Sequence, residues 1–184
     1  MLGFDALGIP LHPLVVHFPV VLSVLLPISV LVALWGIRRG TTPRSAWALP
    51  VAVAAALTLS AYVAIETGER EEDRVEQVVG DAVIHGHEEA AERFLVLSGV
   101  LLLVAGVGLV PRTVGEAARI LTAVGAFGLL AAGVQVGHSG GELVYRHGAA
   151  SAYTNEGGTA TDGAARPVAA TPPRTDERDG RRER

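Results

Sequence analysis

The side chains of this 184-residue sequence best suited to hold a metal or a haem are its six histidines. Neutral imidazole is the commonest metal ligand in proteins and is also an axial ligand of haem iron. Cysteine is absent, which excludes disulfides, thiolate ligands and haem attachment through cysteine. The histidines lie close to the ends of long apolar segments: His12, His17, His85, His87, His138 and His147.

The composition is typical of a membrane protein, because 49% of the residues are hydrophobic and only 18% are charged. The net charge is -4 and the arginines are scattered, so nucleic acid is not expected as a partner. No nucleophile–base pair or nucleotide-binding loop is evident. Electron transfer or metal binding is therefore expected in preference to stand-alone catalysis.

Four apolar segments approach the ~20 residues that a helix needs to cross a bilayer. They predict an all-α fold, a bundle of four transmembrane helices formed by residues 1–148. The following residues, 149–184, are rich in Ala, Thr, Pro, Gly and Arg and are predicted to be a disordered tail. Part of the acidic segment 66–92 is expected to lie along the membrane surface. The predicted spans are 14–37, 46–66, 90–110 and 118–137.

Four antiparallel spans bring the starts of the first and third and the ends of the second and fourth to one side. All six histidines then lie on that face, together with Glu66. The two loops opposite are rich in arginine, and the positive-inside tendency makes them cytoplasmic. The histidine face and both termini are therefore expected to be extracytoplasmic. The arginines at the opposite face are Arg38, Arg39, Arg44, Arg112 and Arg119.

Haem held by two histidines needs imidazoles from different helices that point to one centre. The histidines nearest the apolar spans, His17 and His138, are the best candidates. Gln135 shares a helical face with His138, and Arg93 or Arg146 would pair with haem propionates. The outer histidines His12, His85, His87 and His147 would serve a second centre or bind propionates.

Two alternatives stay open beside haem. In the first, three or four of the six histidines, with Glu66 or Glu88, bind Zn or Cu for transport, sensing or storage. In the second, the protein is a structural or assembly subunit whose motifs only lock the helix ends. The pair His85 and His87 is weak evidence alone, because residues two apart on a helix point to different sides.

The motifs HPLVVHFP near the start and GHSGGELVYRHG near the end resemble a family of predicted bacterial four-helix integral membrane proteins of unknown function. That family reads HPxxVHFP, four apolar spans, then GHxGGxLVYxHG, and the resemblance covers residues 8–150. Some members are joined to Rieske or cytochrome c modules, which implies electron transfer. This chain has no such module, so a quinone or a separate redox partner protein is expected.

We therefore expect a small b-type cytochrome-like protein of the bacterial cytoplasmic membrane. It would bind haem b through histidines at the extracytoplasmic face and pass electrons between a quinone pool and an external carrier. The spacing Gly133-xxx-Gly137 allows close approach of a neighbouring helix, as in a homo-oligomer, or of a flat ligand. No convincing similarity between the two predicted hairpins is evident.

Overall fold

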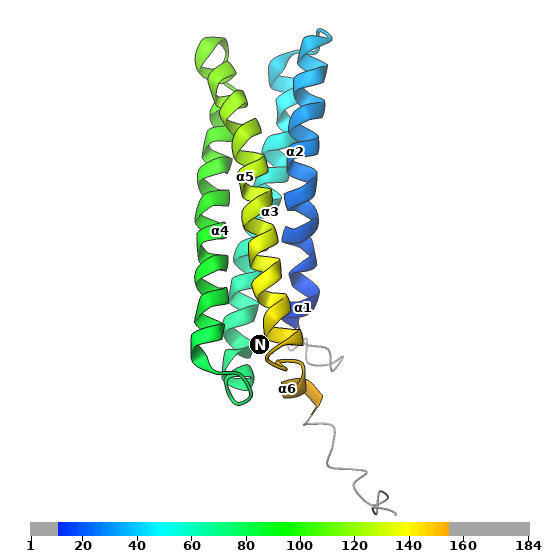
Figure 1. Ribbon diagram of the computed structural model, residues 1–184. Coiled ribbons are helices and arrows are strands. Elements are labelled where there is room, and N and C mark those ends of the chain that lie inside the picture. The colour runs from blue at the N-terminus through cyan, green and yellow to red at the C-terminus, as the bar shows by residue number, and fades with distance from the viewer. Residues whose placement is uncertain (1–10, 155–184) are drawn as a thin grey trace, which may run out of the picture.

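The computed structural model describes residues 11–154 as an antiparallel bundle of four long helical arms (Figure 1). Each arm is long and apolar enough to cross a membrane, which confirms the predicted all-α transmembrane bundle. Neighbouring arms pack in the ring α2–α3–α4–α5 and back to α2. The elements are α1 (Leu11–Val15), α2 (His17–Arg38), α3 (Pro43–Glu76), α4 (Asp81–Val107), α5 (Arg112–Tyr145) and α6 (Ser151–Thr154).

The first arm is interrupted at Val16, between α1 and α2. Pro19 lacks a backbone N–H, and its ring crowds the carbonyl four residues earlier, so the helical pattern is weakened there. Backbone hydrogen bonds still cross the interruption, from Val16 to His12 and from Val20 to Val16. Pro27, by contrast, lies within α2 and is buried. The interruption at Val16 therefore falls where the first histidine motif enters the bundle.

The helices extend further than the apolar spans predicted. The link between α3 and α4 contains only residues 77–80, so the expectation of a surface-lying segment at 66–92 is wrong. Three of its valines, Val75, Val79 and Val83, pack instead in a small cluster with Ile84, Leu143 and Ala149. α3 has 34 residues, which gives a length of roughly 50 Å, well beyond ~30 Å of hydrocarbon. The bundle end that carries the histidines thus projects past the apolar layer.

The tail predicted from residue 149 onward begins before the folded structure ends. After the left-handed turn at Gly148, Ala149 and Ala152 are buried, and α6 follows at Ser151–Thr154. Ala149 contacts the cluster formed by Val79, Ile84 and Leu143, so the folded domain continues past residue 148. The rest of the predicted tail, 155–184, and residues 1–10 lie outside the described residues.

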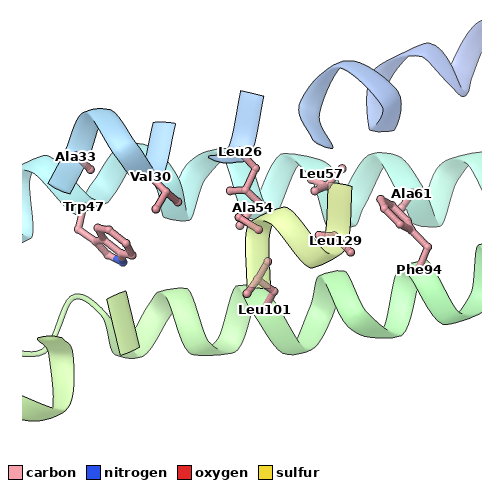
Figure 2. Packing of buried hydrophobic residues seen from close by; sticks show 11 residues of the cluster. Leu26, Val30, Ala33, Trp47, Ala54, Leu57, Ala61, Phe94, Leu101 and Leu129 are labelled. Atoms are coloured by element: carbon pink, nitrogen blue, oxygen red, sulfur yellow. The ribbon is translucent and has the colours of Figure 1, made fainter. Parts of the chain in front are cut away.

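The core runs along the bundle axis and is filled mainly by small and branched side chains from all four arms (Figure 2). Trp47 is fully buried near the loop end, and its indole N–H donates to the carbonyl of Ala105 at 2.9 Å. This bond joins α3 to the end of α4. The close approach of the indole requires Gly108, where a Cβ would lie 2.3 Å from the indole nitrogen.

Arg119 is also buried at the loop end, although the sequence placed it with the cytoplasmic arginines. Its Nε donates to the carbonyl of Gly108 at 2.9 Å, and its Nη2 to that of Val110 at 3.4 Å. The last carbonyls of a helix have no partner within it and carry partial negative charge, so a guanidinium satisfies both needs. Arg119 of α5 therefore links the loop end of the bundle together by hydrogen-bonding to carbonyls at the end of α4 and in the following link.

Replacing the buried Trp47 with Phe removes the hydrogen bond between helices and leaves a small void. We expect Trp47→Phe to destabilise the protein by about 1–3 kcal/mol. Trp35→Phe is the matched control, because Trp35 is 60% exposed and loses only a contact with Arg39. Thermal unfolding of the detergent-purified protein measures both. Equal losses in the two variants would contradict the role assigned to Trp47.

Candidate functional site

All six histidines lie at the end of the bundle where α2 and α4 begin and α3 and α5 end (Figure 1). This placement follows from the antiparallel topology. The histidines differ in the direction of their rings: two rings pack against neighbouring helices, and the other four are exposed. The two that pack inward are His12 of α1 and His87 of α4.

The ring of His12 is fixed against α3. Its Nδ1 lies 2.9 Å from the carbonyl oxygen of Ala64 and 3.4 Å from Oγ1 of Thr67. A carbonyl only accepts, so Nδ1 carries the proton and Nε2 keeps a free lone pair. The ring lies over Gly68, where a Cβ would be 3.2 Å from Cε1.

The ring of His87 is held in the same way against α5. Its Nδ1 lies 2.9 Å from Oγ of Ser139, whose hydroxyl donates to the carbonyl of Val136 at 3.0 Å. Because that hydroxyl proton is already committed, the serine oxygen accepts from Nδ1–H. The ring lies over Gly140, where a Cβ would be 3.1 Å from Cε1.

The two hairpins therefore build one arrangement twice. His12 of α1 packs on Thr67-Gly68 near the end of α3. His87 of α4 packs on Ser139-Gly140 near the end of α5. The hydroxyl in both cases donates to the carbonyl three residues earlier. The sequence alone suggested no such similarity, because the shared signal is only two residues long in each half.

In both rings, the hydrogen bond to the neighbouring helix is made through Nδ1. Histidines that bind metals almost always donate their other ring N–H to a carbonyl, carboxylate or water. Both rings thus have the tautomer and the fixed orientation of ligands.

Glu71 fixes the segment that carries His12. Its Oε1 accepts the backbone N–H groups of Leu11 at 2.9 Å and of His12 at 3.2 Å. The first N–H groups of a helix lack partners within it, and a carboxylate also complements their partial positive charge. This cap ties α1 to α3 and sets the depth of His12.

The ligand pair expected from the sequence, His17 and His138, is not brought together inside the bundle. Both side chains are exposed, and His138 is 73% so. His17 donates from Nδ1 to the carbonyl of Pro13 at 2.7 Å, and Nε2 of His138 lies 3.6 Å from Glu142 of its own helix. On α5 it is the next residue, Ser139, that turns inward.

The remaining predicted site residues lie on the outside of the same end. His85 pairs with Glu88 at 3.0 Å, Arg146 with Glu142 at 2.6 Å, and Glu66 with Arg70 at 3.8 Å. His85 and His87 do point to different sides of α4, as their spacing predicted. Gln135 and His147 are exposed, and Arg93 pairs with Glu89.

A family model described as "Predicted membrane protein (DUF2231)" matches residues 8–152. The chain belongs to this family, in agreement with the resemblance suggested by its two end motifs. No curated protein and no solved structure matches the chain.

The close contact of His87 with Gly140 can be tested against the neighbouring glycine. A Cβ at Gly141 meets nothing within 4 Å, so Gly141→Ala should stabilise the helix by about 0.5–1 kcal/mol through helix propensity. At Gly140 the added methyl group must displace the imidazole, so Gly140→Ala should lose that gain. Thermal unfolding checks both variants, and equal stabilisation would show that the ring does not rest on Gly140.

Proposed function

We propose that this member of the DUF2231 family binds haem b, which His12 and His87 would hold, and carries electrons in a bacterial cytoplasmic membrane. The observation that supports this proposal is the matched anchoring of two imidazoles from different helices. Each is held through Nδ1 against a neighbouring helix at the same end of the bundle. Bundle interiors are common sites for cofactors held by facing helices.

The number of inward ligands favours haem over a bare metal ion at this pair. Zinc takes three or four protein ligands, whereas haem iron needs only two axial ones. The other four histidines are exposed and have their own local partners or none. Gly68 and Gly140 leave the space that the two imidazole rings occupy, so each ring packs directly on the backbone of the neighbouring helix.

The chain also supplies groups that would tune the iron. Hydrogen bonds from Nδ1–H to oxygen increase the basicity of the imidazole and fix its plane. A more basic axial ligand favours ferric iron, so Thr67 and Ser139 help to set the potential. Haem supplies the electron-accepting iron. The protein would supply ligation and orientation.

Orientation follows from charge at the opposite end of the bundle. Arg38, Arg39, Arg44 and Arg112 remain near the loops there, although Arg119 is internal. The positive-inside tendency then places the histidine end outside the cytoplasm. Electrons would pass between a quinone or membrane dehydrogenase and a separate external carrier. The exposed His17, His138, His147, Gln135 and Arg146 are candidates for contacts with propionates or that partner.

Haem retention by the detergent-purified protein tests the assignment. We expect a Soret band that shifts on reduction, and its loss in His12→Ala and in His87→Ala because each removes an axial ligand. His17→Ala and His138→Ala are matched controls from the same end of the bundle and should keep the band. Loss of the band in the controls alone would restore the ligand pair expected from the sequence.

Two other outcomes would replace the proposal. Colourless protein that holds stoichiometric Zn or Cu through His12 and His87 would favour a metal-binding function in transport, sensing or storage. Protein that binds neither haem nor metal would favour a structural or assembly subunit.

A further inference from the structure

A second group of metal-ligating side chains lies on the outer face of the histidine end. It consists of Glu72 of α3 and of His85 and Glu88 of α4, and one ligand atom from each lies within 4.8 Å of the others. His85 and Glu88 are three apart and share a helical face, with Nδ1 of His85 3.0 Å from Oε2 of Glu88. The antiparallel link at 77–80 brings Glu72 opposite them.

We propose that Glu72, His85 and Glu88 bind a first-row divalent cation of the Zn²⁺ class. One imidazole nitrogen and two carboxylate oxygens suit such an ion, whereas Mg²⁺ and Ca²⁺ prefer oxygen ligands alone. Three protein ligands leave the fourth tetrahedral position to water. Around Zn²⁺ the ligand atoms would lie roughly 3.4 Å apart. Small rotamer changes of these solvent-accessible side chains reach that spacing.

The charges around the group support a cation there. The carboxylates of Glu72 and Glu88 are close enough to repel each other, and Glu76 and Asp73 add to the negative potential at Glu72. Two of the nearby arginines are paired elsewhere, Arg70 with Glu66 and Arg93 with Glu89. Within residues 11–154, Glu72 has no arginine partner. A bound dication would relieve this repulsion, and the imidazole of His85 would supply a neutral nitrogen ligand.

The ion would join the segments that position the two inward imidazoles. Glu72 follows Glu71, which caps the helix of His12, and His85 precedes His87 by two residues. A metal bridge from α3 to α4 would therefore act as a clamp behind both rings. The site shares no residue with the proposed haem ligands, so either proposal stands without the other.

Zinc binding to the full-length, chelator-washed protein in detergent tests the site. We expect one Zn²⁺ per chain by calorimetry, a rise in the unfolding temperature with Zn²⁺ and none with Mg²⁺. Mutating residues that only hydrogen-bond to metal ligands lowers metal affinity roughly 10–100-fold. Glu72→Gln and His85→Ala each remove a ligand itself, so each should lower the Zn²⁺ affinity by at least about tenfold. Glu89→Gln is the matched control, because Glu89 lies on the same helix and pairs with Arg93.

The inference is overturned if the protein takes up no Zn²⁺, or if Glu89→Gln weakens binding as much as Glu72→Gln does. Zinc uptake that survives His85→Ala and is lost in His12→Ala or His87→Ala would also overturn it, since the inward pair would then be the metal site. Because Soret absorbance is read separately on the same preparations, failure of this site is distinguishable from failure of the haem proposal.

Discussion

In the hydrocarbon of a bilayer, every buried polar group must find its hydrogen-bond partner inside the protein. Four helices satisfy this for the backbone, and the buried hydroxyls follow the same rule. Ser29, Ser98 and Thr122 each donate to a carbonyl three or four residues earlier in their own helix. Among the described residues, no buried side-chain nitrogen or oxygen lacks a partner. The hydroxyls of Thr67 and Ser139 follow the same pattern: each donates to a carbonyl of its own helix, and its oxygen accepts a hydrogen bond from an imidazole.

The two ends of the bundle handle polar groups differently. At the loop end, Trp47 and Arg119 donate their N–H groups to carbonyls near the end of α4. At the histidine end, each inward imidazole is held to its neighbouring helix through Nδ1. The closed end is suited to stability, and the other end keeps two lone pairs at fixed positions. This asymmetry is the main physical reason to look for function where the histidines are.

The exposed ion pairs at the histidine end contribute little to the stability of the bundle. They join residues three or four apart on one helix, and most of these side chains are exposed, so each stabilises the protein little. Glu71 differs because it crosses from α3 to the start of α1. Glu72 and Glu88 differ because they approach each other from two helices without an arginine between them. Contacts between helices, and not the local pairs, hold the inward rings in place.

The sequence by itself determined the membrane-spanning bundle, its antiparallel order and the end at which the histidines lie, because these depend on apolar run length and the number of crossings. Only the tertiary structure decided which rings turn inward. Successive side chains of an α-helix are rotated by about 100° about its axis, so His138 faces outward while Ser139 faces His87. The length of an apolar run does not show which of two neighbouring residues faces the bundle interior. The roles of Gly68 and Gly140 were also hidden, since a glycine's function here is the space it leaves for a ring from another helix. Arg119 lies at the loop end as the sequence predicted, but its burial was hidden for the same reason: only packing brings the carbonyls of Gly108 and Val110 within reach.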